Sequence, residues 1–362
     1  NIPAGNVETL LDSTGDVGKY TSVTIGADGL GLISYHDATN GDLKVAHCDN
    51  TACTSATTST IDSDGDVGKY TSITIGADGF GLISYWDETN GDLKVAHCDN
   101  TSCTSATKTT LDSTVGSTNG TSITIGADGL GLISYYRQDL GALRVVHCSN
   151  TNCTSATKNY IQGMGGNVGE YPSITIGADG LGLISYYSGS NRDLEVAHCS
   201  NTSCTATTTT RLDSTGNVGS YTSITIGADG FGLISYWDET NGDLKVAHCD
   251  NTSCTSATKT TLDSTVGSTN GTSITIGADG LGLISYYRQD LGALRVVHCS
   301  NTNCTSATKN YIQGMGGNVG EYPSITIGAD GLGLISYYAG SNRDLEVAHC
   351  ENTFCTPYFR RR

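Results

Sequence analysis

The sequence TSITIGADGFGLISYWDETNGDLKVAHC, Thr71 to Cys98, decides the fold because close copies of it fill the chain. A larger duplication lies on top of this repeat, since Tyr70 to Tyr187 recur without a change as Tyr221 to Tyr338. Repeats at this period are typical of a propeller, a solenoid or another array. We therefore expect one repetitive domain over residues 1–362. The pentapeptide IGADG marks seven repeats of 50 or 51 residues, beginning at Ile25, Ile75, Ile125, Ile176, Ile226, Ile276 and Ile327.

Each repeat predicts four β-strands. In the second repeat, the β-branched stretch at 70–77 is followed by Asp78-Gly79, a pair preferred in tight two-residue hairpin turns. The stretches FGLISYW, DLKVAHC and SATKTTLD follow in order, separated by polar turns. Helical apolar spacing is absent from the repeats. The pattern predicts an all-β chain with four antiparallel strands in each repeat.

The two ends of the chain favour a closed ring over an open solenoid. The segment Val7 to Asp12 matches a fourth strand that has no first three strands before it, and the last repeat lacks a fourth strand after Cys355. We therefore expect a seven-bladed β-propeller whose last blade is completed by Val7 to Asp12. Closure of this kind removes exposed sheet edges. The segment 356–362, TPYFRRR, then forms a basic C-terminal tail.

The quoted stretch resembles the "SI-x-x-x-x-x-G-x-x-x-ISYYD…GDLKxA" repeat of secreted prokaryotic β-propeller proteins. The resemblance covers nearly the whole chain and implies the propeller fold. Similar propellers serve as lectins, adhesion modules and enzyme scaffolds, so the fold alone does not assign a function. The sialidase pattern S-x-D-x-G-x-T-W does not occur in this sequence.

All fourteen cysteines fall into pairs five positions apart, which predicts one short-loop disulfide per blade and an oxidising, extracellular location. Zinc is the alternative, but His97, Cys98 and Cys103 offer three ligands where structural zinc takes four. The histidine that precedes the first cysteine is expected to donate to a backbone carbonyl or a loop hydroxyl. The predicted pairs are Cys48–Cys53, Cys98–Cys103, Cys148–Cys153, Cys199–Cys204, Cys249–Cys254, Cys299–Cys304 and Cys350–Cys355.

Composition excludes some partners. The formal charge of −17 argues against nucleic acid, because binding to phosphates needs a basic face. No apolar run approaches the roughly 20 residues that a membrane helix needs. We find no nucleophile elbow, no phosphate-binding loop and no metalloprotease helix. A repeated array also spreads its chemistry evenly, so we expect that the protein is not an enzyme.

An aromatic residue with carboxylates beside it recurs on one loop face, and sugars are commonly held by an aromatic platform with hydrogen-bond acceptors. The alternative is that these rings fill gaps between blades. The candidate glycan-binding residues are Trp86, Asp87, Glu88, Tyr136, Trp237, Asp238, Glu239 and Tyr287.

Other acidic and polar motifs suggest weaker sites. The loop DSDGDVG, Asp62 to Gly68, resembles the start of a calcium loop but lacks its glycine and its distant glutamate. We expect solvated turn carboxylates and no cofactor, with calcium as the alternative. A ring of hairpin-turn aspartates, one per repeat like Asp78, is a further place for a cation, although turn chemistry explains each of them. Candidate glycosylation sites are Asn100, Asn119, Asn201, Asn251 and Asn270.

From these observations we predict that the protein is a non-catalytic extracellular structural protein that self-associates into a filament or a layer. The basic tail is expected to contact the acidic loop face of a neighbouring copy. Its candidate assembly contacts are Tyr358, Phe359, Arg360, Arg361 and Arg362. The alternative is a multivalent, lectin-like carbohydrate-binding propeller. The expected partners are a second copy of the chain, another extracellular or cell-surface protein, or glycans.

Overall fold

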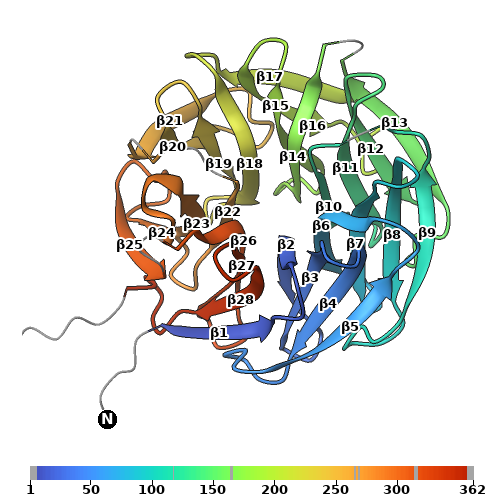
Figure 1. Ribbon diagram of the computed structural model, residues 1–362. Helices are drawn as coiled ribbons and strands as arrows, with labels where there is room; N and C mark the ends of the chain where they lie inside the picture. Colours follow the sequence, from blue (N-terminus) through green and yellow to red (C-terminus); the bar gives the residue numbers. More distant parts are fainter. Residues whose placement is uncertain are drawn as a thin grey trace, which may run out of the picture.

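The computed structural model describes residues 6–116, 118–163, 166–264, 266–267, 270–313 and 317–356. Seven four-stranded antiparallel sheets stand around a central axis like the blades of a propeller (Figure 1). The predicted all-β, seven-bladed fold is therefore confirmed. We number the blades 1 to 7 in chain order, and in each blade the first strand lies nearest the axis (Figure 1).

The strands of the first four blades follow a constant order from the axis outward. Blade 1 contains β2 (Val17–Ile25), β3 (Gly31–Asp37), β4 (Asp42–Cys48) and β5 (Ala56–Asp62). Blade 2 contains β6 (Val67–Ile75), β7 (Gly81–Asp87), β8 (Asp92–Cys98) and β9 (Ala106–Asp112). Blade 3 contains β10 (Thr121–Ile125), β11 (Gly131–Arg137), β12 (Ala142–Cys148) and β13 (Ala156–Gln162). Blade 4 contains β14 (Val168–Ile176), β15 (Gly182–Ser188), β16 (Asp193–Cys199) and β17 (Thr207–Asp213).

The duplicated half repeats this arrangement. Blade 5 contains β18 (Val218–Ile226), β19 (Gly232–Asp238), β20 (Asp243–Cys249) and β21 (Ala257–Asp263). Blade 6 contains β22 (Thr272–Ile276), β23 (Gly282–Arg288), β24 (Ala293–Cys299) and β25 (Ala307–Gln313), with the short 3-10 helix η1 (Gln289–Leu291) between β23 and β24. Blade 7 contains β26 (Val319–Ile327), β27 (Gly333–Ala339), β28 (Asp344–His349) and β1.

The ring closes through the N-terminal strand, as predicted. Strand β1 (Val7–Asp12) pairs antiparallel with β28 and takes the outermost position of blade 7. Val7 lies opposite His349 and Asp12 opposite Leu345, with a register shift between Leu10 and Asp12. The seven sheets therefore form one closed set in which the first and last segments of the chain share a blade.

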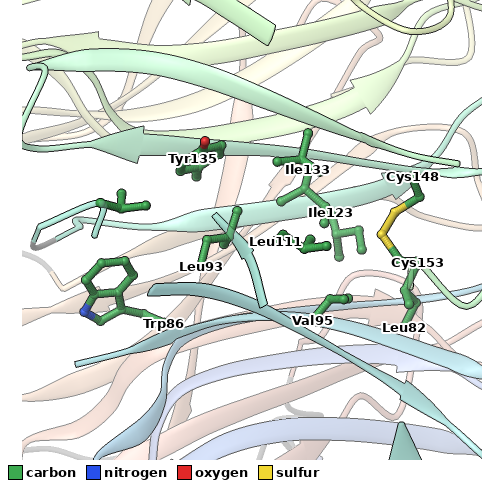
Figure 2. Close-up of a cluster of buried hydrophobic side chains, with 12 residues drawn as sticks. Leu82, Trp86, Leu93, Val95, Leu111, Ile123, Ile133, Tyr135, Cys148 and Cys153 are labelled. Atoms are coloured by element: carbon green, nitrogen blue, oxygen red, sulfur yellow. A yellow bond between two sulfur atoms is a disulfide. The ribbon is translucent and has the colours of Figure 1, made fainter. Parts of the chain in front are cut away.

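The hydrophobic core is divided into clusters, each between two adjacent blades. The middle strands of a blade are buried along their whole length because a neighbouring blade covers each face. Figure 2 shows one cluster, in which Leu82, Trp86 and Val95 of blade 2 pack against Ile123 and Ile133 of blade 3. Many small interfaces of this kind replace the single large core that the low aromatic content argues against.

All seven predicted disulfides are present, and none of the fourteen cysteines is free. The Cα atoms of Cys98 and Cys103 are 4.9 Å apart, which is an ordinary separation for a disulfide. A β-carbon at Gly81 would lie 2.8 Å from the Cys98 sulfur, so the start of the second strand must be glycine. Seven disulfides fit an oxidising, extracellular environment.

The histidine beside each disulfide has a different partner from the one that we predicted. His97 Nε2 lies 2.7 Å from the Asp78 carboxylate, in the hairpin turn of the same blade. The other oxygen of Asp78 accepts a hydrogen bond from the Phe80 backbone N–H. The expectation of a carbonyl or hydroxyl partner was therefore wrong, because the turn aspartate fills that role. The pairs are His47–Asp28, His97–Asp78, His147–Asp128, His198–Asp179, His248–Asp229, His298–Asp279 and His349–Asp330.

A buried carboxylate joins each of five pairs of adjacent blades. Asp62, at the end of blade 1, accepts hydrogen bonds from Tyr85 Oη at 2.7 Å and Lys94 Nζ at 2.6 Å, both in blade 2. Tyr85 is fully buried and Asp62 is 1% exposed. The same arrangement recurs at Asp12, Asp112, Asp213 and Asp263, with arginine in place of lysine at Asp112 and Asp263. Gln162 and Gln313 accept the tyrosine hydrogen bond at the other two junctions.

This arrangement corrects the expectation of solvated turn carboxylates in the loop Asp62 to Gly68, for which calcium was the alternative, because Asp62 is buried. Burial alone would raise the pKa of Asp62, but hydrogen bonds from Lys94, Tyr85 and Lys108 outweigh it and lower the pKa to about 2. Asp64 also contacts Lys108. Asp66 contacts Lys69, so all three aspartates of the loop have cationic protein partners.

We predict that Asp62→Asn lowers the free energy of unfolding at neutral pH by about 3 kcal/mol, because Lys94 is left buried without its counter-charge. Chemical denaturation measures this loss. Asp64→Asn, which changes an exposed carboxylate of the same loop, is the matched control and is expected to change stability by less than about 0.5 kcal/mol. Equal stability of Asp62→Asn and the parent protein would contradict this interpretation.

The same pair predicts how stability depends on pH. Because the pKa of Asp62 and that of Asp213 are each lowered to about 2 in the folded protein, their contribution is fully present above the unfolded-state value of about 3.9. It is lost as the pH falls from about 4 through about 2. Across this pH window, the free energy of unfolding measured by chemical denaturation is expected to fall more steeply for the parent protein than for Asp62→Asn. Parallel losses would contradict the pKa assignment.

Candidate functional site

Five tyrosines surround the axis at one end of the innermost strands. Each has a left-handed backbone with φ between 50° and 55°, a conformation that costs a non-glycine residue on the order of 1 kcal/mol. Register shifts on both sides of this position, as between Lys69 and Ser72 in β6, keep the residue out of the regular ladder. The tyrosines are Tyr20, Tyr70, Tyr171, Tyr221 and Tyr322.

The tyrosine rings gather into two groups. Tyr20 contacts Tyr70 and Tyr322, with ring centroids 4.3 and 4.6 Å apart. Tyr171 contacts Tyr221, with centroids 4.3 Å apart. The Tyr20 hydroxyl group shares hydrogen bonds with those of Tyr70 and Tyr322. Burial raises the pKa of Tyr322 to about 12, and the nearby Glu321 charge adds to the shift. The site therefore offers aromatic surface together with neutral hydroxyl groups.

Two glycines interrupt the tyrosine wall. Gly120 and Gly271 occupy the tyrosine position in blades 3 and 6, whose innermost strands β10 and β22 have five residues where the others have nine. A β-carbon on Gly120 would face Pro172 Cδ at 3.3 Å, and one on Gly271 would face Pro323 Cδ at 3.4 Å. We call these two ring-free places the Gly120 gap and the Gly271 gap.

A cavity of about 190 Å³ lies between the tyrosines and the gaps. The side-chain amides of Asn119 and Asn270 line it next to the two glycines. Each amide contacts a partly buried glutamate of the following blade: Asn119 is hydrogen bonded to Glu170, and Asn270 Nδ2 donates to Glu321 Oε2 at 3.1 Å. The glutamates therefore lie behind the lining, each beside one gap.

The two glutamates have the same local sequence but different neighbours. Burial raises the pKa of Glu170, the Asn119 hydrogen bond lowers it, and the negative charge of Glu239 raises it further. Burial also raises the pKa of Glu321, but both the Asn270 hydrogen bond and the positive charge of Lys19 lower it. Glu170 is therefore the carboxyl group whose surroundings favour the protonated form more strongly.

The difference arises from the blade that follows each copy of the duplicated block. Glu170 of blade 4 faces blade 5, which contains Glu239 and, at the position of Lys19, Ser220. Glu321 of blade 7 faces blade 1, which has Lys19 and, at the position of Glu239, Ala38. The duplication has therefore produced two gaps of nearly identical sequence: the charge of Glu239 acts on the glutamate of the first, whereas that of the second has Lys19 nearby, which is ion-paired with Asp16.

Blade 2 shows how Glu239 differs from its own counterpart. Lys69 contacts both Asp66 and Glu88 there. In blade 5 the lysine is replaced by Ser220, whose hydroxyl group is buried and has no hydrogen-bond partner among the described residues. Glu239 accepts a hydrogen bond from the Asn217 amide, so it keeps a polar contact but lacks the lysine. Its negative charge is therefore available to act on Glu170.

The predicted aromatic rim lies elsewhere. Trp86, Tyr136, Trp237 and Tyr287 are each 3% exposed, and none of them lines the cavity. Their rings are packed between blades, which is the arrangement that the sequence left open as the alternative. Asp87 and Asp238 are also buried, whereas Glu88 and Glu239 are exposed. Sugar binding at this rim stays a prediction, and the burial of its rings does not support it.

The remaining sequence-based candidates are dispersed. Asn119 and Asn270 belong to the cavity, whereas Asn100, Asn201 and Asn251 lie in the disulfide loops, and glycosylation at all five stays a prediction. The candidate assembly residues Tyr358, Phe359, Arg360, Arg361 and Arg362 lie outside the described residues. Over the described ranges we find no group of three histidine, cysteine or acidic side chains placed to hold a metal ion. No helix in the same ranges is long and apolar enough to cross a membrane.

Sequence reasoning missed the cavity, although one column of the repeat alignment marks it. The dipeptide at the axis reads Lys-Tyr, Lys-Tyr, Asn-Gly, Glu-Tyr, Ser-Tyr, Asn-Gly and Glu-Tyr in blades 1 to 7. Most positions that flank this column are nearly invariant along the chain. Variation at one position of an otherwise uniform repeat is the signal that would have located the site.

No family model matches this sequence, and no curated protein matches it. Solved structures match its fold over most of the chain. A Dyadobacter fermentans protein of unknown function is 12% identical to this chain, with a TM-score of 0.61. The match covers 94% of this chain and 97% of that protein. An α-L-arabinofuranosidase from Fusarium graminearum, solved with an iminosugar inhibitor, is 11% identical with a TM-score of 0.56, over 96% and 98% of the two chains. A Penicillium chrysogenum α-L-arabinanase complexed with arabinobiose is 14% identical with a TM-score of 0.54, over 77% and 92%.

These neighbours correct the function predicted from the sequence. The expectation of a non-catalytic structural protein without enzymatic activity is wrong, because the neighbours of this fold include glycoside hydrolases. The lectin-like alternative stays a prediction. The error came from the assumption that a repeated array spreads its chemistry evenly. The axial column shows that the array is uneven where the blades converge.

Glu170 and Glu321 allow a direct test of whether the adjacent blade makes two copies of the same residue different. We predict that the pKa of Glu170 lies above that of Glu321, because Glu239 is next to the first and Lys19 is next to the second. NMR titration of isotope-labelled glutamate carboxyls, assigned with Glu170→Gln and Glu321→Gln, measures both values. Glu239→Gln is expected to lower the pKa of Glu170 and to leave that of Glu321 in place. Equal values, or the reverse order, would show that the adjacent blade does not set the difference.

Proposed function

We propose that the protein is a secreted glycoside hydrolase whose active site lies at the junction of blades 4 and 5. The feature that supports this most directly is Glu170, a partly buried carboxyl group that is hydrogen bonded to Asn119 of the cavity lining and feels the negative charge of Glu239. Glycosidases use two carboxyl groups, one kept protonated as an acid and one ionised. Burial and the charge of Glu239 both act to keep Glu170 protonated. At the junction of blades 7 and 1, next to Glu321, Ala38 stands at the position of Glu239.

In the proposed reaction, the bond between the anomeric carbon and the glycosidic oxygen breaks. Glu170 gives its proton to the departing oxygen, and a water oxygen bonds to the anomeric carbon while Glu239 accepts the water proton. Attack by the Glu239 carboxylate itself, followed by hydrolysis, is the retaining version of the same chemistry. The anomeric configuration of the first product distinguishes the two.

The cavity supplies what a sugar requires. Tyrosine rings cover apolar C–H faces, while the tyrosine hydroxyl groups and the Asn119 amide hydrogen bond to sugar hydroxyls. Oligosaccharides of L-arabinose are the first substrates to test, because two structural neighbours are an arabinanase and an arabinofuranosidase. The seven disulfides and the resemblance to secreted propeller repeats support action outside the cell.

The test incubates the protein with linear arabinan and with a panel of other plant and microbial polysaccharides. Hydrolysis is measured as the release of reducing ends. Glu170→Gln and Glu239→Gln are each expected to lower kcat by about 100-fold or more. Glu88→Gln, the counterpart of Glu239 in blade 2, is expected to retain the parent kcat because Glu88 contacts Lys69 and not the Glu170 junction. Full activity of Glu170→Gln would contradict the assignment, as would equal losses in Glu88→Gln and Glu239→Gln.

A further inference from the structure

Two tyrosines on the outer wall of the ring are exposed. Tyr160 in β13 is 39% exposed and Tyr311 in β25 is 40% exposed, whereas the other tyrosines that the structure describes line the axial cavity or are buried. Strands β13 and β25 are the outermost strands of blades 3 and 6 and lie on well-separated parts of the perimeter (Figure 1). The equivalent residues of the other blades are not aromatic: Leu10, Thr60, Thr110, Arg211 and Thr261.

An arginine on the neighbouring strand holds each ring. Arg144 is the cross-strand partner of Tyr160, and Arg295 is that of Tyr311. The centre of the Arg295 guanidinium lies 4.3 Å from the centroid of the Tyr311 ring. Burial raises the pKa of Tyr160, and the charge of Arg144 acts in the opposite direction, so this guanidinium is also close to its tyrosine. Because a cation covers one face of the ring, the exposed area lies on the other face and the edge.

The ion pairs beside each exposed ring have more cations than carboxylates. The buried Asp112 accepts hydrogen bonds from Arg137, Arg144 and Lys158. Arg137 also pairs with Asp139. Three cations therefore meet two carboxylates. The same set recurs between blades 5 and 6 as Asp263, Arg288, Arg295, Lys309 and Asp290.

Blade 2 provides a matched comparison within the same chain. Its turn at 87–94 holds one lysine, two aspartates and one glutamate, whereas the turn at 137–144 of blade 3 holds two arginines and one aspartate. Blade 2 has Lys108 at the position of Lys158 but Thr110 at the position of Tyr160. On a molecule with a formal charge of −17, blades 3 and 6 thus combine exposed aromatic surface with a more basic turn.

A ring and an ammonium group lie together on this wall. Lys158 and Tyr160 are two residues apart in β13, so they project from the same face of the strand about 7 Å apart. The side chain of Lys158 is 40% exposed, and so is that of Lys309. A tyrosine ring packs against the apolar C–H face of a sugar, and an ammonium group pairs with a carboxylate. A sugar that carries a carboxylate contacts both groups, whereas a neutral sugar contacts the ring alone.

We infer that the outer wall holds two equivalent binding sites for an acidic glycan, one formed by Tyr160 and Lys158 and the other by Tyr311 and Lys309. In each site a uronate ring lies on the tyrosine, and its carboxylate pairs with the lysine. Because both sites belong to one closed ring, a polymer that occupies them together is held more tightly than by either site alone. Neither tyrosine lines the axial cavity, so this inference is independent of the proposed hydrolysis.

Calorimetric titration of the full-length protein with short oligogalacturonates tests this inference, with neutral galacto-oligosaccharides of equal length as the comparison. The oligogalacturonates are expected to fill two equivalent sites per chain, and their affinity is expected to fall as salt is added. Tyr160→Ala is expected to weaken one of the two sites by about tenfold and to leave the other unchanged. Tyr160→Ala combined with Tyr311→Ala is expected to weaken both.

Matched variants separate the ring from the charge. Tyr160→Phe, which keeps the ring, and Thr110→Ala, at the equivalent position of blade 2, are expected to retain the parent affinity. Lys158→Gln combined with Lys309→Gln is expected to remove the preference for the acidic ligand. Glu170→Gln is expected to keep both outer sites, so a failure at the axis and a failure on the wall are distinguishable.

Three outcomes overturn the inference. The first is binding of the oligogalacturonates at one site or at none. The second is equal affinity for the acidic and the neutral ligand. The third is parent affinity in the double tyrosine variant, with chemical denaturation used to verify that this variant is folded.

Discussion

The buried hydrogen bonds from tyrosine and a cation to a carboxylate at the blade junctions are the interaction on which the rest of the structure depends. With only four Phe and two Trp, the interfaces between blades consist mainly of aliphatic side chains and one fully buried tyrosine per blade. Each blade must be fixed against the next in angle as well as in distance. Asp62, bonded to Tyr85 and Lys94, does this with a directional contact at the outer end of the interface. The disulfide and the His97–Asp78 pair brace the opposite end of the blade. With both ends held, the innermost strands converge and their strained tyrosines meet at the axis.

Duplication of a three-blade block inside a seven-blade ring produces asymmetry without further change in the copied residues. Blades 2 to 4 and 5 to 7 share an identical stretch, but one copy is followed by blade 5 and the other by blade 1. Glu170 and Glu321 consequently meet opposite charges, from Glu239 and from Lys19. The surroundings of a copied residue are therefore set by the junction in which it lies and not by the repeat itself.

The sequence predicted the architecture well because the repeat, the turn pairs and the cysteine spacing are local signals. It also predicted the ring closure, since the orphan strand at Val7 to Asp12 had only one empty place to fill. It failed where the outcome depends on the adjacent blade. For Trp86 the sequence left open both a sugar platform and packing between blades, and blade 3 covers the ring. Asp62 was expected to be a solvated turn carboxylate, yet it is buried and accepts hydrogen bonds from blade 2. Glu170 attracted no attention because its partner, Glu239, is distant in sequence and close only in the folded ring.

The central claim is that a sugar binds at the axis, among the tyrosines, with the junction of blades 4 and 5 as its reactive side. A crystal structure of Glu170→Gln soaked with a linear oligosaccharide tests this claim most directly. The account predicts one sugar unit within the axial cavity, with a glycosidic oxygen within hydrogen-bond reach of residue 170. An oligosaccharide bound instead on the outer loops beside Trp86 or Trp237, with the axial cavity empty, would contradict it.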